Sequence, residues 1–350
     1  MKRIAVIFML LSAAVWGQYE TQQDYQESAD KVDKVYVECD MGKIYCEPSS
    51  DNNVSISVKK NIFIKDDEKA KRLADDIKVD FTVRNKTLRA IVDIPESIRN
   101  GKLSISKLFE DSRKGDTEIL IRVLLPENIG TEIKTASADI YLTDLKGNNL
   151  DIKGSSSDIS LENTKGNCGI DVSSGDFEGR DIQGDIDFSG SSADVNIDGL
   201  TGNLKIAVSS GDCYLERIIG DARIRSSSGD IKLINLTGNL YSTSNSGDFR
   251  GENITGSVDI STTSGAINLI HYAGDENNIY TDATSGDIHI EVPMSFKGKV
   301  ELESASGDIS SGVDLMTRSK SSKHLAGTLA EGNGLIKAET TSGDIFLESY

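Results

Sequence analysis

Aspartates that return at a constant interval are the residues best placed to do chemistry in this sequence. Most follow a pair of small residues and precede an apolar one, and each stands 18 residues after the last. A row of carboxylates could hold Ca²⁺, which takes oxygen ligands. The same residues suit turns, because Gly adopts unusual backbone angles and Asp accepts a backbone N–H. The regular column comprises Asp158, Asp176, Asp194, Asp212, Asp230 and Asp248.

Energetics favour the turn interpretation of this column. On successive coils about 4.8 Å apart, neighbouring carboxylates repel by about 0.9 kcal/mol in water. One turn hydrogen bond contributes roughly 0.5–1.5 kcal/mol and offsets that cost. Calcium is the alternative, although the sequence lacks the doubled glycines of nonapeptide calcium rolls. We expect no other cofactor. The calcium ligands would be Asp176, Asp194, Asp212, Asp230 and Asp248.

A second candidate site lies in the stretch 313–334, which interrupts the repeat. It gathers Arg318, Lys320, Lys323 and His324 in an otherwise acidic sequence. Insertions in repeat proteins often form binding loops, so these four residues are candidates for holding an anionic glycan. The alternative is a C-terminal cap that covers the last coils.

Nothing in the sequence has the pattern of a catalytic centre. No nucleophile or metal-ligand motif accompanies His271, His289 or His324. His289 alternates with two isoleucines, which predicts that it faces solvent. The acidic residues follow the repeat and form no isolated pair. We therefore predict that the protein is not an enzyme.

The four cysteines divide into two pairs. Cys39 and Cys46 flank one predicted corner, and an exported protein permits a disulfide between them. Cys168 and Cys213 are two and a half coils apart, about 12 Å along a stack of strands. A disulfide requires Cα atoms within about 7 Å, so we expect both to be buried free thiols.

A repeating fold must position these residues. A second glycine corner lies half a period from each aspartate, and apolar residues alternate with polar ones between corners. Such alternation indicates a strand with one buried face, and stacked coils bury a continuous apolar row. We predict an all-β single-stranded parallel β-helix, a β-solenoid with 18-residue coils, in preference to a sandwich or a barrel. Parallel crossovers favour the right-handed form.

Four segments are expected along the chain. Residues 1–17 have the charged start and apolar run of a signal peptide, and residues 18–32 are a polar linker. Residues 33–136 form a β-rich N-terminal cap with one helix at about 66–77, and its first strands form a degenerate coil. Residues 137–350 form the regular solenoid with the repeat-breaking loop at 313–334.

Charge and hydropathy restrict the partners. Removing Lys2 and Arg3 from 38 basic residues leaves 36 against 56 acidic ones, a net charge of −20. Such a surface repels nucleic acid and anionic lipid. The apolar run at residues 4–16 is too short for a stable membrane span, and no second run of spanning length follows. We expect an exported protein in the periplasm, at the cell surface or outside the cell.

Three passages carry a family resemblance. They are the corner Cys39–Ile44 with the strand and acidic helix after it, the join of Ile119–Pro126 to Ser137–Ile140, and Leu325–Gly334 continuing at Thr341–Ile345. Together they resemble the bacterial "putative adhesin" family, a domain of unknown function. The resemblance covers nearly all of the chain after the signal peptide. It implies a β-helix outside the cytoplasm with a role in adhesion or the envelope, and brings no catalytic residues.

We therefore predict a non-catalytic, exported binding module of the cell envelope or surface. Rows of polar residues on the solenoid faces would contact an extracellular or envelope glycan or protein. A structural protein whose coil ends stack between chains is an alternative, and so is a polysaccharide lyase or hydrolase. The first two differ in assembly, as a monomer or as an end-to-end oligomer.

Overall fold

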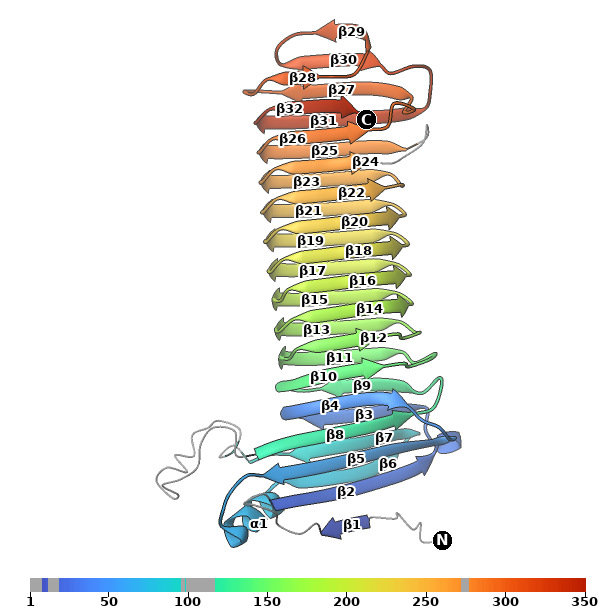
Figure 1. Cartoon of the computed structure of the whole chain (residues 1–350), viewed down its shortest axis with the longest axis vertical. Coiled ribbons are helices and arrows are strands. Elements are labelled where there is room, and N and C mark those ends of the chain that lie inside the picture. Colours follow the sequence, from blue (N-terminus) through green and yellow to red (C-terminus); the bar gives the residue numbers. More distant parts are fainter. Residues whose placement is uncertain (1–7, 12–18, 96–97, 99–116, 272–276) are drawn as a thin grey trace. The chain divides into compact units, whose positions relative to one another are not determined.

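The computed structural model describes residues 8–11, 19–95, 98, 117–271 and 277–350. The chain divides into two compact units, residues 1–175 (unit 1) and 176–350 (unit 2). Within each unit, nearly all described elements are β-strands in two sheets, which we call sheet A and sheet B (Figure 1). The strands of the regular repeat are parallel, so the predicted β-solenoid is confirmed.

In unit 2, each regular coil gives one strand to sheet A and the next to sheet B. Alternate apolar side chains point inward, and Phe177, Val195 and Ile231 are at most 2% exposed, as the columns predicted. The sheet A strands, in spatial order, are β14 (Phe177–Gln183), β16 (Val195–Thr201), β18 (Cys213–Ile219), β20 (Ile231–Thr237), β22 (Phe249–Ile254), β24 (Ile267–His271), β26 (Ile288–Val292), β32 (Ile345–Ser349) and β28 (Ile309–Ser311).

Sheet B of unit 2 follows the same pattern and ends in an antiparallel hairpin. Its strands, in spatial order, are β15 (Ile186–Ser192), β17 (Leu204–Ser210), β19 (Ala222–Ser228), β21 (Leu240–Ser246), β23 (Val258–Ser264), β25 (Asn278–Ser285), β31 (Gly334–Ser342), β27 (Gly298–Ser304), β30 (His324–Thr328) and β29 (Met316–Lys320). The expected loop at 313–334 therefore contains the β29–β30 hairpin, which pairs with β27.

The strand order of unit 2 departs from the chain order near the C-terminus. Strand β32 lies between β26 and β28, and β31 lies between β25 and β27. The register places Ile345 opposite both Ile288 and Ile309. The last strands in the sequence are thus paired on both sides, and an earlier coil forms the end of the stack.

Unit 1 shows a similar insertion. Strands β3 (Lys34–Cys39) and β4 (Met41–Pro48) lie between later strands of the chain. Lys43 pairs with Asp139, so the predicted degenerate coil joins the stack with lysine in an aspartate position. Sheet A of unit 1 contains β1 (Phe8–Leu11), β2 (Tyr19–Ser28), β5 (Asn53–Ile62), β8 (Thr117–Leu125), β4 (Met41–Pro48), β10 (Ser137–Thr143) and β12 (Ile159–Glu162). Sheet B contains β6 (Lys78–Arg84), β7 (Thr87–Asp93), β3 (Lys34–Cys39), β9 (Gly130–Lys134), β11 (Leu150–Ser156) and β13 (Cys168–Ser174).

The predicted helix is present as α1 (Asp67–Asp76). Asp66 caps its N-terminus by accepting the N–H of Lys69. At the other end the buried Lys60 donates its ammonium to the carbonyls of Ala74 and Ile77, at 3.0 and 2.6 Å. A cation there satisfies unpaired carbonyls and complements the helix dipole.

The expected polar linker at 18–32 is wrong for most of its length. Residues 19–28 form strand β2, which pairs antiparallel with β5 over ten residues, and 29–31 form the 3₁₀ turn η1 (Ala29–Lys31). Tyr25 stacks on Phe81 with ring centroids 5.3 Å apart. The polar segment becomes a strand because it pairs with β5, a tertiary contact that local composition does not report.

The expected signal peptide lies outside the described residues except for β1, which pairs antiparallel with β2. Among the described helices, none has both the length and the apolar character needed to cross a bilayer.

Candidate functional site

The aspartate column of unit 2 forms a continuous hydrogen-bond ladder. From Asp176 to Asp248, Oδ1 of each aspartate accepts the backbone N–H of the residue 18 positions later, at 2.8–3.2 Å. The ladder reaches Ala266, which donates its N–H but has no carboxylate to continue the series. Each aspartate thus ties its own corner to the next coil.

The opposite corner carries a second ladder built from both aspartate and asparagine. Asp185, Asn203, Asp221 and Asn239 each accept the N–H of the next member through Oδ1, at 2.7–3.1 Å, and Ser257 is the last donor. Because amides and carboxylates alternate here, the shared property is the acceptor oxygen and not the negative charge. This supports the turn interpretation of the aspartate column, while calcium binding stays an untested prediction.

Replacing one ladder aspartate should separate acceptor from charge. We expect Asp212→Ala to lower the unfolding free energy by about 1 kcal/mol, because the N–H of Asp230 loses its acceptor. Asp212→Asn keeps that oxygen and should stay within about 0.5 kcal/mol of wild type. Urea unfolding followed by circular dichroism gives both values. Equal losses of unfolding free energy in the two variants would show that the negative charge of Asp212 matters. A calcium-induced rise in melting temperature that occurs only in wild type would show the same.

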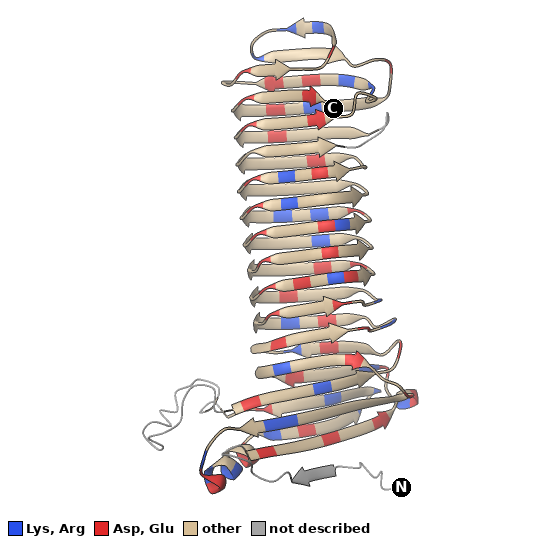
Figure 2. Cartoon of the chain, in the orientation of Figure 1, with Lys and Arg blue, Asp and Glu red and all other residues tan. Residues whose placement is uncertain are grey.

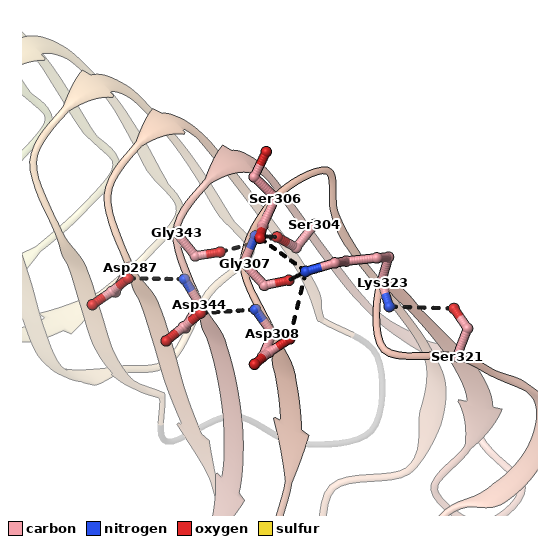
Figure 3. Close-up of polar contacts among 9 residues, drawn as sticks. All are labelled: Asp287, Ser304, Ser306, Gly307, Asp308, Ser321, Lys323, Gly343 and Asp344. Carbon is pink, nitrogen blue, oxygen red and sulfur yellow. Dashed lines mark hydrogen bonds and ion pairs between the residues drawn. The ribbon is translucent and has the colours of Figure 1, made fainter.

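The structure places the four predicted basic residues in two different environments. Arg318 and Lys320 are exposed on β29, and His324 begins β30. Lys323 instead lies against the last corner of unit 2 (Figure 3). Its ammonium donates to the carbonyls of Ser306, at 2.8 Å, and Gly307, and pairs with Asp308 at 3.4 Å.

This arrangement gives Lys323 a structural contribution at the end of the ladder. Asp308 donates its N–H to Asp344, which in turn donates to Asp287, so Asp308 is the last aspartate of the series (Figure 3). The ammonium of Lys323 covers carbonyls that no further coil in the described chain would bind. These contacts favour the cap interpretation over the anionic-glycan interpretation for Lys323.

A different set of residues forms a shallow polar hollow on unit 2. The outward side chains of β22, β24, β26 and β32 stand in two columns of four, which we call the polar grid. One column is Arg250, Asn268, His289 and Phe346, and the other is Glu252, Ile270, Glu291 and Glu348.

The grid is hollowed at its second row. A depression of about 250 Å³ is lined by polar and charged side chains together with three small or apolar residues. The lining residues are Arg250, Gly251, Glu252, Asn268, Leu269, Ile270, His289 and Glu291. Asn268 is shorter than Arg250 and His289 on either side, which leaves the space. Arg250 donates to Glu252 at 2.6 Å, so that pair is neutralised internally.

Two further carboxylates converge on His289. Nε2 of His289 lies 3.8 Å from Glu291 and 3.7 Å from Glu348, beyond hydrogen-bond distance. That nitrogen is shielded from solvent yet has no hydrogen-bond partner. The imidazole also makes an edge contact with Phe346, at 6.2 Å between ring centroids.

The sequence predicted only that His289 faces outward, and its side chain is 36% exposed. It did not predict the grid, because Phe346 and Glu348 stand 57 residues after His289 and Glu291. The strand pattern identifies outward positions, but only the insertion of β32 beside β26 places them together.

All four cysteines are buried free thiols, so the structure does not contain the disulfide allowed between Cys39 and Cys46. Cys39 lies on β3 in sheet B and donates to the carbonyl of Met41, whereas Cys46 lies on β4 in sheet A. The prediction for Cys168 and Cys213 is confirmed. Burial raises the pKa of each of the four thiols to about 12, which makes them poor nucleophiles.

We expect His271 to make the stability of unit 2 depend on pH. Its side chain is fully buried and its Nε2–H donates to the carbonyl of Gly256 at 2.7 Å. Burial lowers the pKa of His271 below its ordinary value of 6.5. Above pH 6.5 the His271 side chain is neutral in both the folded and the unfolded protein. Below pH 6.5 it takes up a proton in the unfolded protein, whereas burial disfavours protonation in the folded protein.

Unfolding free energy should therefore fall as the pH drops from 6.5, by at most about 1.4 kcal/mol per pH unit from this residue. Urea midpoints at pH 7.5 and 5.5 measure the loss. His271→Gln keeps an amide donor and should lose less stability over this interval than wild type. Identical pH dependence in both proteins would contradict the assignment.

Comparison with known proteins identifies one family. The family model described as Toastrack DUF4097 matches residues 40–250 and 237–348. No curated protein matches the chain at a significant level.

Several solved structures match most of this chain at low sequence identity. A "putative cell adhesion protein" from Clostridium sporogenes is 10% identical, covers 95% of this chain and 100% of its own, and has a TM-score of 0.23. A "putative lipid binding protein" from Parabacteroides distasonis is 13% identical, covers 93% and 96%, and has a TM-score of 0.28. A "putative adhesin" from Bacteroides fragilis is 13% identical, covers 95% and 97%, and has a TM-score of 0.24.

Proposed function

The chain belongs to the Toastrack DUF4097 family, in agreement with the resemblance seen in its sequence, and from this premise we propose that it is a non-catalytic glycan-binding module of the cell envelope or surface. The ligand lies on the outer face of sheet A in unit 2, over the polar grid. Binding is by polar contacts from several rungs at once.

The depression over Asn268 is the observation that carries this proposal. It brings a guanidinium, carboxylates, an amide and an imidazole around one hollow. Such a mixture of donors and acceptors suits the hydroxyl groups of a sugar. The side chains of Arg250 and Glu348 are 62% and 58% exposed, so they stay accessible to a ligand.

The charge distribution agrees with a polar ligand. Acidic and basic residues are scattered among uncharged ones on the strands of unit 2 (Figure 2). Two arginines, Arg223 and Arg225, share β19, but the basic residues form no continuous stripe across the strands. Contact with nucleic acid needs a basic stripe, which these strands do not offer. Export of the chain from the cytoplasm forms part of the proposal and rests on the N-terminal sequence.

A binding role fits unit 2 better than end-to-end assembly or catalysis. At the described end of unit 2, β28 has three residues, and β29, whose five residues are all exposed, carries Arg318 and Lys320. Short, charged edge strands disfavour pairing with another chain. Glu348 is 58% exposed, whereas a glycosidase general acid needs a shielded site.

A glycan array probed with residues 18–350 tests the proposal. We expect binding that Asn268→Ala removes and that Asn196→Ala retains. Asn196 is a matched control, because it stands in the same outward column four strands earlier, outside the depression. An array without binding, or equal binding by both variants, would refute the proposed site.

A further inference from the structure

Two arginines on β19 carry positive charge that no carboxylate neutralises. Arg223 and Arg225 both point outward from sheet B and are exposed, and β19 shows two basic segments in Figure 2. No ion pair to either side chain is present among the residues that the structure describes. Other basic residues of the regular coils do have acidic partners: the pairs are Arg180 with Glu178, Lys205 with Asp187, Arg217 with Asp198, and Arg250 with Glu252. Arg223 and Arg225 are therefore available to an external anion.

The neighbours of Arg225 leave its guanidinium open. Ala207 on β17 and Thr243 on β21 stand directly opposite Arg225 on the two flanking strands. Both residues are uncharged and much shorter than arginine. Ser227, farther along β19, is exposed as well. The five N–H donors of this guanidinium thus stand above short side chains, where a ligand can reach them from the side.

A tyrosine fixes the position of the second guanidinium. The guanidinium of Arg223 lies over the ring of Tyr241 on the next strand, 5.0 Å from the ring centroid. Such a contact restricts the side chain without consuming its N–H donors. Tyr241 also stands between Arg223 and Asp259 in the same outward column. On the other side, Lys205 is held by Asp187 at 2.7 Å. Arg223 is therefore oriented before a ligand arrives.

From this geometry we infer a second binding site, on sheet B of unit 2, that takes the carboxylate groups of an acidic glycan. We call Arg223, Arg225, Tyr241 and Thr243 the arginine shelf. Cα atoms two residues apart on a strand are about 6.7 Å apart, so both guanidiniums reach one short stretch of sugar units. Each guanidinium matches the planar fork of a carboxylate, and the hydroxyls of Thr243 and Ser227 suit those of a sugar. The arginine shelf goes beyond the proposed function, because the polar grid lies on sheet A.

The charge of the rest of the chain favours a ligand of low charge density. The net charge is −18, so nucleic acid or a heavily sulfated glycan is repelled everywhere outside the arginine shelf. The shelf itself offers two unpaired cations, and the positions flanking Arg225 are neutral. A uronic acid unit carries one carboxylate and several hydroxyls, which match this mixture of guanidinium and hydroxyl groups. A carboxylated glycan therefore fits the shelf better than a polymer of phosphate or sulfate groups does.

Isothermal titration of the purified protein with tetragalacturonate and with its fully methyl-esterified form tests this inference, because the ester keeps the sugar and lacks the charge. At physiological ionic strength we expect the acid to bind about tenfold more tightly than the ester, and Arg225→Gln to lower the affinity for the acid about tenfold. Arg180→Gln is the matched control, since it removes the same charge from an exposed arginine on sheet A. That variant should stay within about twofold of wild type, because remote charges are screened.

The outcomes decide the arginine shelf separately from the polar grid. No binding of the acid, equal affinity for acid and ester, or an affinity that Arg225→Gln leaves unchanged overturns the shelf. An equal loss in Arg180→Gln also overturns it, because general charge attraction would then explain the binding. Tighter binding of a thymidylate tetramer or a heparin tetrasaccharide overturns the assignment to carboxylates. Asn268→Ala should leave binding of the acid intact, and melting curves show whether each variant is folded.

Discussion

One methyl group at Gly229 is expected to remove a large part of the stability of unit 2. Gly229 occupies a corner with φ of +119°, a conformation that L side chains rarely adopt. A Cβ at this position would lie 2.1 Å from the carbonyl oxygen of Gly211 in the preceding coil. That oxygen belongs to a stacked backbone and cannot rotate away. We expect Gly229→Ala to lower the unfolding free energy by roughly 4 kcal/mol or more.

Gly312→Ala serves as the control for this substitution. A Cβ there would be at least 3.8 Å from its nearest neighbours, and Gly312 has no left-handed φ. Urea unfolding of both variants should show a large shift in midpoint for Gly229→Ala and almost none for Gly312→Ala. If the two midpoints coincide, close stacking of the glycine corners does not limit stability.

Removing the last two strands should disrupt more of the chain than it deletes. A chain that ends at Glu331 lacks β31 and β32, which separate β25 and β26 from β27 and β28. Strands β27 and β28 then lose every parallel neighbour that the strand pairings give them. The β29–β30 hairpin stays paired with β27, but β27 is no longer held to the rest of the stack by β31. We expect residues 298–331 to unfold together, while the coils up to β26 keep their protection.

Hydrogen exchange measured by mass spectrometry tests directly whether residues 298–331 unfold. In wild type, peptides covering 298–304 should be protected; in the truncated chain they should exchange within seconds. Deleting only the hairpin residues 314–330, with a short linker, is the control and should leave β27 protected by β31. Protection of β27 in the chain that ends at Glu331 would contradict the observed strand order.

The ladders connect this stability to the proposed binding surface. Fixed hydrogen bonds at both corners, such as Asp230 to Asp248 and Asp221 to Asn239, hold successive coils in register. Outward side chains on different coils therefore keep their relative positions without direct contact. A ligand spanning several rungs meets a surface that is already arranged, which reduces the ordering cost of binding.

Much of the solenoid could be predicted because the residues that specify each coil lie close together in the sequence. Alternation around Phe177, Val195 and Ile231 shows which side chains point inward, and glycine before aspartate marks the corners. The helix at 67–76 was also predicted, since its capping residue Asp66 and its apolar face lie within a few turns. The aspartate column was identified correctly, although its use as a ladder between coils required the structure.

The features that were missed all depend on contacts between distant segments. Strand β2 has a polar sequence and forms because β5 offers it a partner. Lys323 belongs to a basic cluster in the sequence, yet its ammonium is used by carbonyls at residues 306 and 307. Neither partner is visible from the local sequence.

The sequence by itself determined the repeat length, the inward columns and the corner residues, because each depends on backbone geometry and burial within one coil. Only the tertiary structure decided the order in which coils stack. Coils with the same apolar columns can pair equally well with several neighbours, so their order is set by connections such as the hairpin at 316–328. That order places β32 beside β26, and so it creates the group of His289, Glu291 and Glu348.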